Sequence, residues 1–454
     1  MRRAFVGILL VVVVGLGVAT WVQWDPLPLV EPHGVPGVVG HATPLRLTVR
    51  SPGPGLSMLR LVARRNGQTW ALFEQFFART SWRGSGVQVF DVEVTPDWAA
   101  LAIPEGELHL ELWVSTYGWH IRGHDRAPAW EGGVRLDTTP PHVELLTTQH
   151  NVRLGGVELA IWRAADAVES GVEVGGYYFP GVAGYFADPQ LLLGLFAIPQ
   201  DLDTMAQPRV VATDAAGNRS ERNIPVRIQA RRFAERVLTI DDKFLARKVP
   251  EIEAANQLPA QGSLLDRYLR INRELRRENE ARIREMTRAS DPKPLWLASF
   301  HRQSNSAPLS SFADRRTYVY RGEEVDRQVH LGFDLASIAA SPVEAAQAGR
   351  VVFAGNLGIY GNTVVLDHGL GLFTLYGHLR SLDVAVGQRV ERGEKLGLTG
   401  ETGLAAGDHL HFSVMLWGVH VDPVEWWDGD WIRKHLLAKL EAFPRASAAA
   451  NDNR

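Results

Sequence analysis

Histidine and aspartate residues in the C-terminal part of the sequence have the types and spacing to bind a metal or transfer protons. His409 and His411 flank a single leucine in GDHLHF. His330 and Asp334 stand at the two ends of HLGFD, and His378 lies in LYGHL. Imidazole and carboxylate are ligands of zinc, and a catalytic zinc ion typically takes three protein ligands and a water. Five candidates for three positions leave two residues for proton transfer.

The spacing of these residues limits how they can share one metal ion. On a strand, His409 and His411 point to the same face about 7 Å apart, so one can bind a metal while the other reaches a water or substrate. His330 and Asp334 would lie about 13 Å apart on a straight strand, so the chain must bend between them. Gly332 permits that bend. Each motif alone is more often structural, and a purely structural role stays open at this point.

Short strands and tight glycine turns must position these residues. RVVFAG, NTVVLDHG, FTLYGHL and DVAVGQRVERGEKLGLTG follow one another between residues 296 and 430. Before them, residues 263–286 predict a helix that starts with a capping box of Ser263 and Asp266. One narrow stripe of this helix consists of Leu265, Leu269, Asn272, Leu275, Asn279, Ile283 and Met286. The stripe is typical of a packing seam, and the alternatives are a lid over the next domain or a surface for a partner.

The remaining chain predicts a mainly β, multidomain protein. Residues 45–137 show the apolar alternation of half-buried strands. Residues 138–230 open with prolines and close with ATDAAGNRS, which resemble the start and the last turn of bacterial immunoglobulin-like domains, so two β-sandwich domains are expected. Residues 25–44 predict a spacer rich in proline and glycine. Residues 231–295 predict a helical linker, and residues 431–454 predict a tail that starts as a helix.

The N-terminus indicates the compartment. Arg2 and Arg3 precede an uncharged apolar run, residues 4–22, that is long enough to cross a bilayer as a helix. Positive charge before the run favours an N-terminus held inside and export of the rest. We therefore predict a transmembrane anchor over residues 1–24, with the bulk of the chain in the periplasm. The alternative is secretion after cleavage of a signal peptide near Ala19.

The composition excludes several classes of function. The chain has no cysteine, which excludes disulfides, thiol catalysis and a cysteine-ligated zinc site. The formal net charge is −3, so no broad basic surface for nucleic acid is expected. A chain of 454 residues is too long for one compact core, which agrees with several domains.

The site motifs together resemble the LytM/lysostaphin-type zinc endopeptidases. The resemblance rests on the order and spacing of HLGFD, GNTVVLDHGLGLFTLYGHL and TGLAAGDHLHF, and it spans the peptidase-like domain predicted for residues 296–430. An upstream stretch, SSFADRR, resembles a further family segment, but Ala313 stands where glycine is usual.

The resemblance implies a role for each of the five candidates. His330, Asp334 and His411 are expected to hold one zinc ion per chain. His409 and His378 are expected to be the catalytic pair that does not bind the metal. His409 would act as the general base, and His378 would stabilise the oxyanion or share the proton transfer.

The resemblance also implies a substrate and partners. We expect a membrane-anchored zinc metalloendopeptidase that hydrolyses peptide cross-links of bacterial peptidoglycan, with peptidoglycan and the inner membrane as partners. A divisome or other cell-envelope protein is a further partner that this placement allows. The alternative function is a non-catalytic or latent LytM-type regulator that binds and activates another cell-wall hydrolase. Proteolysis of exported proteins is a third interpretation.

Overall fold

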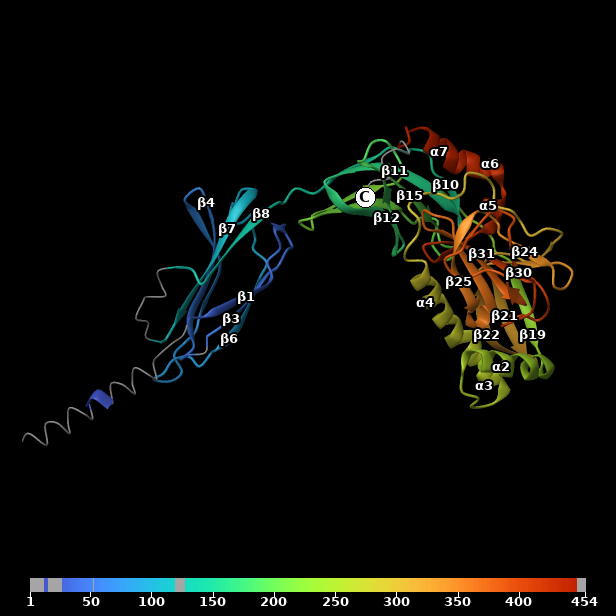
Figure 1. Ribbon diagram of the computed structural model, residues 1–454, viewed down its shortest axis with the longest axis horizontal. Coiled ribbons are helices and arrows are strands. Elements are labelled where there is room, and N and C mark those ends of the chain that lie inside the picture. The colour runs from blue at the N-terminus through green and yellow to red at the C-terminus, as the bar shows by residue number, and fades with distance from the viewer. Residues whose placement is uncertain (1–11, 15–26, 52, 119–126, 447–454) are drawn as a thin grey trace, which may run out of the picture. The chain divides into compact units, whose positions relative to one another are not determined.

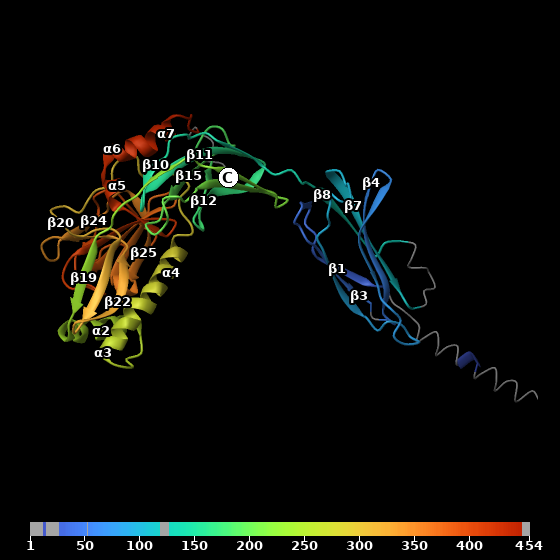
Figure 2. The same ribbon diagram turned by 180° about the vertical axis from the view of Figure 1, so that it is seen from behind.

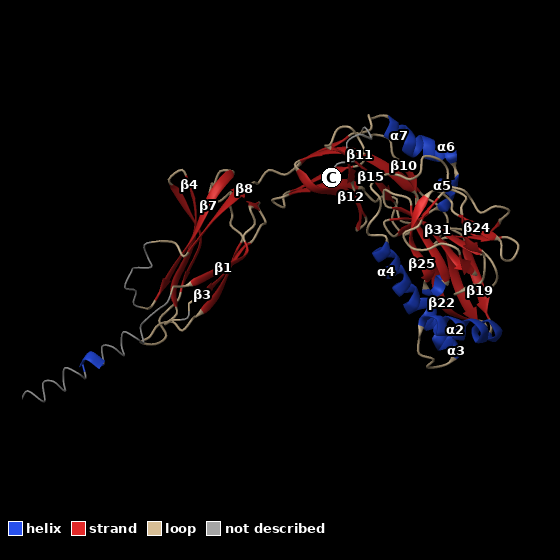
Figure 3. Cartoon of the chain, in the orientation of Figure 1, coloured by secondary structure: helices blue, strands red, loops and turns tan. Residues whose placement is uncertain are grey.

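A computed structural model describes residues 12–14, 27–51, 53–118 and 127–446 of the chain. Within these residues no helix is long and apolar enough to cross a membrane, and the predicted anchor lies outside them except for residues 12–14. Strands dominate the described chain, which confirms the mainly β class (Figure 3). The chain divides into two compact units. The first comprises residues up to Pro141 with Asp166–Val168 and Thr213–Ser220, and the second comprises the rest.

The first unit is a sandwich of two sheets with strand orders β1-β3-β6 and β2-β8-β7-β4-β5 (Figure 1). The strands are β1 Leu29–Gly34, β2 Val38–Val39, β3 Leu45–Arg50, β4 Leu56–Arg65, β5 Gln68–Phe76, β6 Val89–Val94, β7 Gly106–Thr116 and β8 Trp130–Leu136. Alternate side chains of both sheets, among them Leu47 and Leu110, form one buried core.

Residues 25–44 are not the predicted spacer throughout. Strand β1 pairs antiparallel with β3, and β2 pairs in parallel with β8. Val39 is fully buried in the core, and Val30 packs against it. The proline and glycine content of the segment concealed these strands, because their pairing partners lie outside it.

The next part of the chain forms two four-stranded sheets, with strand orders β14-β15-β11-β9 and β13-β12-β16-β17. The strands of this second β domain are β9 His142–Leu145, β10 Asn151–Arg153, β11 Val157–Ala165, β12 Ala167–Val174, β13 Tyr177–Pro180, β14 Val182–Ala183, β15 Leu191–Ala197, β16 Arg209–Asp214, β17 Arg219–Asn223 and β18 Arg227–Gln229. The turn predicted in ATDAAGNRS joins β16 to β17, and Gly217 has a φ of 83° there. The immunoglobulin-like character of both β domains stays a prediction.

The C-terminal region is built on a sheet of order β20-β23-β31-β27-β26-β25-β29, with β32 beside β31. Two three-stranded sheets, β19-β21-β22 and β24-β30-β28, complete it. The strands are β19 Glu235–Ile240, β20 Ala307–Ser310, β21 Asp314–Tyr320, β22 Glu323–His330, β23 Phe333–Ala336, β24 Pro342–Glu344, β25 Gly349–Asn356, β26 Asn362–Asp367, β27 Leu372–Leu379, β28 Ser381–Leu382, β29 Arg389–Val390, β30 Lys395–Leu398, β31 Leu410–Leu416 and β32 Val419–Val421. Strands β23, β31 and β27 are neighbours, which determines where the predicted site residues lie.

The helix predicted over 263–286 is present as α3 Leu264–Arg270, a π-helical turn η2 Ile271–Leu275 and α4 Arg276–Met286. The predicted capping box of Ser263 and Asp266 is confirmed. The predicted stripe is a packing seam, because Leu275 and Ile283 are buried in a core shared with strands β26, β27 and β31. Figures 1 and 2 show α2 Asp242–Asn256, α3 and α4 against this region from both sides.

Residues 231–295 are therefore not a linker between domains. Strand β19 pairs in parallel with β21 over six residues, and Leu245, Val249 and Ile252 of α2 belong to the same core as the sheet. The segment joins the fold because packing against the sheet removes its apolar side chains from water.

Short helices end the described chain: α5 Pro423–Trp427, α6 Gly429–Ile432, η4 Arg433–Leu437 and α7 Ala438–Glu441. Ile432, Leu436 and Leu440 are buried, so the predicted tail begins as a packed helical segment. Residues 447–454 lie outside the described part of the chain.

Candidate metal centre and catalytic residues

Three adjacent chain segments bring the predicted metal ligands together. His330 ends β22, Asp334 lies in β23, and His411 lies in β31 directly opposite Asp334 in the strand register. The chain bends at Gly332, as the spacing predicts. A Cβ at this position would lie 2.5 Å from Nε2 of His411 and 2.6 Å from Oγ of Ser413, so glycine also allows this close approach.

The ligand atoms of these three residues converge on one point. Nε2 of His330 lies 2.9 Å from Oδ1 of Asp334 and 3.0 Å from Nδ1 of His411. Nδ1 of His411 lies 2.9 Å from the same carboxylate oxygen. All three residues are buried, and their ligand atoms form a group that can hold a metal ion.

Hydrogen bonds on the outer side of the two imidazoles determine which nitrogen faces this point. Nδ1–H of His330 donates to the carbonyl oxygen of Ser311 at 3.0 Å. The hydroxyl of Ser413 donates to the carbonyl of Leu331 at 2.8 Å, so it accepts from Nε2–H of His411 at 3.0 Å. In the neutral rings, Nε2 of His330 and Nδ1 of His411 are therefore lone-pair acceptors.

This donor set fits a divalent transition metal. Two imidazole lone pairs and a carboxylate oxygen repel one another at about 3 Å unless a cation lies among them. Two nitrogens and one oxygen match the ligand preference of zinc, and three protein ligands match a catalytic rather than a structural zinc site.

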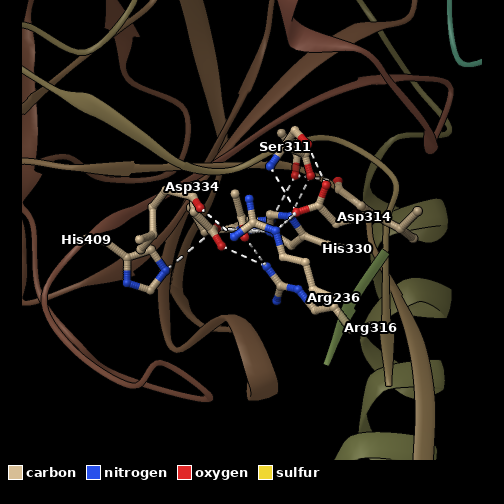
Figure 4. A network of polar contacts seen from close by, with 12 residues as sticks. Arg236, Ser311, Asp314, Arg316, His330, Asp334 and His409 are labelled. Atoms are coloured by element: carbon tan, nitrogen blue, oxygen red, sulfur yellow. Dashed lines mark hydrogen bonds and ion pairs between the residues drawn. The ribbon is translucent and has the colours of Figure 1, made fainter. Parts of the chain in front are cut away.

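The second carboxylate oxygen of Asp334 is held by an arginine (Figure 4). Nη2 of Arg316 donates to Oδ2 of Asp334 and to Oγ of Ser310, both at 3.0 Å. Burial opposes ionisation of Asp334, but the adjacent His330 and the other site histidines, when protonated, hold the pKa of the carboxyl well below its usual range. Arg316 and Ser413 are supporting residues that the sequence motifs did not identify. Arg316 is the last residue of SSFADRR, and Ser413 directly follows DHLHF.

A second ion pair supports the backbone that positions His330. Nε of Arg236, on β19, lies 3.0 Å from Oδ2 of the fully buried Asp314, whose carboxylate also accepts from Ser311 (Figure 4). Ser311 in turn supplies the carbonyl that orients His330. Ala313 stands between them with a φ of 60°, a left-handed conformation that costs about 1 to 2 kcal/mol for a residue with a Cβ. The glycine that the resemblance leads one to expect here would avoid this strain.

The two predicted catalytic histidines lie beside the ligands. The ring centroids of His378 and His409 are 4.9 Å apart, and Nε2 of His409 is 3.6 Å from Oδ1 of Asp334. Nδ1–H of His409 donates to the carbonyl of Gly407 at 2.8 Å, and Nδ1–H of His378 donates to the carbonyl of Thr402 at 2.8 Å. Each ring therefore keeps Nε2 free for proton transfer when neutral.

The protonation tendencies of these two histidines differ. Burial and the adjacent His409 and His411 hold the pKa of His378 well below its ordinary value. Burial also acts against the charged form of His409, but its contact with Asp334 raises the pKa of His409 overall. His378 has a φ of 63°, so strained backbone occurs at the site itself.

A cavity of about 490 Å³ opens beside these five residues. One wall comes from outside the motif region: residues 236–241, Phe244, Tyr268 and Arg276 line it. Thus β19 and the helices α2 to α4 take part in shaping the site. Whether this segment moves as a lid, as the sequence allows, stays a prediction.

Tyr360 also lines this cavity, and helix α4 fixes its position. The Tyr360 hydroxyl donates to Glu280 at 2.7 Å, and Nε2–H of His420 donates to the same carboxylate at 3.1 Å. The backbone amide of Ile359 donates to the side chain of Asn279 at 2.9 Å. The Tyr360 and His411 rings lie 5.2 Å apart, so Tyr360 connects α4 to the proposed metal ligand His411.

Other polar residues of the motif region have structural roles. His368 is buried, and its ring nitrogens contact the carbonyl of Ala348 and the hydroxyl of Thr374, both at 2.7 Å. Tyr376 is buried in the sheet, where its hydroxyl accepts from the amide of Ala346.

The fold places this donor set, which could hold a metal ion, on an antiparallel sheet beside two further histidines. Residues 328–423 match the peptidase family M23, so this C-terminal part of the chain is an M23 peptidase domain, as the resemblance predicts.

Curated relatives match the same part of the chain. The DD-carboxypeptidase/endopeptidase Mpg of Neisseria meningitidis serogroup B is 40% identical over 97 residues, which are 21% of this chain and 22% of that protein. The peptidoglycan DD-endopeptidase ShyA of Vibrio cholerae serotype O1 is 38% identical over 96 residues, again 21% and 22% of the two chains. A crystal structure of a zinc containing peptidase from Vibrio cholerae shares 32% identity over 28% of this chain and 39% of that one, with a TM-score of 0.25. The chain thus spans about a fifth of the length of the curated relatives it matches.

Proposed function

We propose that this protein is a zinc metalloendopeptidase that hydrolyses peptide cross-links of bacterial peptidoglycan. The observation that carries the proposal is the convergence of acceptor atoms from His330, Asp334 and His411 beside two buried histidines with free Nε2 atoms. The substrate is inferred from the matched relatives, one of which is a peptidoglycan DD-endopeptidase. The predicted export of the chain agrees with a substrate outside the cytoplasm.

The proposed chemistry assigns a different duty to each nitrogen. One zinc ion per chain would be held by Nε2 of His330, Oδ1 of Asp334 and Nδ1 of His411. When bound, zinc supplies Lewis-acid chemistry, which lowers the pKa of a water and polarises a carbonyl. His409 accepts the proton of the attacking water at Nε2, since its Nδ1–H is already donated to Gly407.

The tautomer of His378 favours one of its two expected duties. Because Nδ1–H is donated to the carbonyl of Thr402, Nε2 of the neutral ring carries a lone pair and cannot donate to an oxyanion. His378 would accept at Nε2 the second proton of the attacking water and pass it toward the leaving amine, while His409 takes the first. We therefore favour proton transfer over direct stabilisation of the oxyanion.

We further propose that residues 1–24 anchor the protein in the inner membrane with its bulk in the periplasm. The apolar run and the two preceding arginines support this placement. Carbonate extraction of cell membranes tests it: an anchored chain stays with the membranes at full length. A shortened chain in the soluble periplasmic fraction would instead show that a signal peptide is removed.

Digestion of purified sacculi separates the enzyme from the alternative of a regulator. The full chain is the appropriate sample, because α2 to α4 belong to the core of the second unit. We expect zinc-loaded protein to release cross-linked peptides, and Asp334→Asn protein to release none. Full digestion by the Asp334→Asn variant would contradict the proposal. Activation of another hydrolase, without any digestion by this chain alone, would support the regulator.

A further inference from the structure

One end of the sandwich in the first unit carries exposed aromatic and aliphatic side chains. Leu29, Phe76, Trp82 and Val89 are 56%, 65%, 65% and 50% exposed. We call this surface the aromatic end and define it by these four residues together with Arg79 and Arg83. The strand register places Leu29 and Val89 together, because both pair with Arg50. Phe76 ends β5 opposite Met58 near the start of β4, and the loop with Arg79, Trp82 and Arg83 joins β5 to β6.

The loop that carries Trp82 is held firmly to this end. Thr80 N–H donates to the carbonyl of Gly84 at 2.9 Å, and the hydroxyl of Ser85 donates to the carbonyl of Leu56 at 2.7 Å. The guanidinium of Arg79 lies over the ring of Tyr117 at 4.8 Å. The exposed indole of Trp82 is therefore presented by a hydrogen-bonded loop rather than by a loose tip.

Among the described residues, the charge of the aromatic end is net positive, because Arg79 and Arg83 are exposed there and Glu31 is paired with Arg50 at 3.3 Å. Residues 75–90 contain two arginines and no aspartate or glutamate, and residues 51–58 contain no charged residue. The opposite end of the sandwich mixes both signs in residues 64–68 and 97–107. Fixed, exposed aromatic side chains with arginines beside them match the composition of surfaces that lie at a membrane interface.

We propose that the aromatic end lies against an anionic phospholipid surface. Strand β1 starts at this end with Leu29, and the predicted anchor run ends at residue 22, so the anchor would deliver the domain to the bilayer with this end first. Trp82 and Phe76 then enter the interface, and Arg79 and Arg83 face lipid phosphates. The inference rests on the anchor given under Proposed function.

The absence of cysteine in the chain makes a site-specific test direct. Ser81→Cys places one label at the aromatic end, and Gln68→Cys places one at the opposite end. Each full-length protein, carrying an environment-sensitive fluorophore, is reconstituted into phosphatidylcholine vesicles with and without phosphatidylglycerol. In the anionic vesicles, we expect the emission of the fluorophore at position 81 to shift to the blue and to be quenched by acyl-brominated lipid. The fluorophore at position 68 should show neither effect.

Two arginine variants test the contribution of charge. Arg83→Gln should weaken the lipid quenching of the label at position 81. Arg135→Gln removes an exposed arginine at the opposite end and should leave the quenching unchanged.

Vesicle flotation distinguishes failure of this inference from failure of the anchor. A chain that floats with vesicles while both labels stay in water overturns the inference and leaves the anchor intact. A chain that does not float overturns both. A label at position 81 that is shielded without quenching by lipid means that a protein or a second copy covers this end, which also overturns the inference.

Discussion

At the residue scale, the outward hydrogen bond of each imidazole decides which ring nitrogen is available in the site. His330 donates from Nδ1 and offers Nε2, whereas His411 donates from Nε2 and offers Nδ1. His409 and His378 both donate from Nδ1 to backbone carbonyls. His330 shares this Nδ1 donation with the two proposed proton carriers, so the convergence of its Nε2 with Asp334 and His411 is what marks it as a ligand.

The first prediction separates metal binding from proton transfer. His411→Ala should remove a ligand and abolish both zinc binding and peptidoglycan hydrolysis. His409→Ala should keep one zinc per chain, while turnover falls by about 100-fold or more because the general base is lost. Metal analysis and sacculus digestion of both variants check this. A His409→Ala protein with full turnover would contradict the assigned role.

The second prediction concerns Arg316, which holds the oxygen of Asp334 that faces away from the other ligands. Arg316→Met should lower zinc affinity by about 10- to 100-fold, as removal of a group that orients a metal ligand does elsewhere. Competition with a fluorescent chelator measures this change. Arg315→Met, at the exposed neighbouring position, is the control and should leave the affinity unchanged. Equal effects of the two variants would argue against the orienting role.

At the element scale, helix α4 links the segment before the M23 domain to the site within it. Asn279 and Glu280 hold Ile359 and Tyr360 of the turn η3 Gly358–Tyr360. Burial opposes ionisation of Glu280, but His420 and the other donors lower its pKa to about 2. Burial and the neighbouring Glu280 raise the pKa of Tyr360 well above its ordinary value, so its hydroxyl stays a donor.

The third prediction follows from this lowered pKa. The ionised form of Glu280 contributes stability that is fully present above pH 4.5 and is lost as the pH falls toward about 2. Glu280→Gln should lower the free energy of unfolding near neutral pH by about 3 kcal/mol, since it breaks a partly buried pair. Urea unfolding measures it, with Glu278→Gln on the exposed face of α4 as the control. An unchanged free energy of unfolding for Glu280→Gln would contradict the role of the Glu280–His420 pair.

Within the second unit, the β domain before the peptidase region packs directly on it. The amide of Asp422 donates to the carbonyl of Gly155 at 2.7 Å, and the amide of Val157 donates to Glu425 at 3.0 Å. Lys439 donates to the buried Glu158 at 2.7 Å. These contacts join the start of β11 to helices α5 and α7, so the domain is part of the unit that carries the site.

The fourth prediction concerns the pH dependence of this junction. Burial raises the pKa of Glu425 to about 8 from the model-peptide value of 4.5. Between these values the folded protein binds a proton that the unfolded chain does not, so stability falls as the pH rises through this range. Glu425→Gln should flatten that fall, because the amide stays neutral and its oxygen still accepts from Val157.

Urea unfolding at several pH values within this range checks the fourth prediction. Glu441→Gln, an exposed position on α7, should keep the pH dependence of the unsubstituted protein. If Glu425→Gln leaves the slope of the free energy of unfolding against pH unchanged, the carboxyl of Glu425 is not protonated in the folded protein.

Across the whole molecule, local patterns in the sequence determined the β class and the capped helix over 263–286, and they predict the five residues of the candidate site. Each depends on spacing within a few residues: alternation for strands, the Ser263–Asp266 pair for the helix start, and the motifs around His330, His378 and His411. A capping box acts between neighbouring residues, so it is visible without a fold.

Contacts between distant residues were decided only by the tertiary structure. Strand β1 lies in a segment that composition alone describes as a spacer, and it pairs with β3 outside that segment. The segment 231–295 joined the core because its apolar stripe meets a sheet formed later in the chain. The same holds at the site: Arg316 on β21 reaches Asp334 on β23, a contact that no local pattern encodes. Sequence thus determined which chemistry is available, and folding determined which nitrogen and which oxygen carry it out.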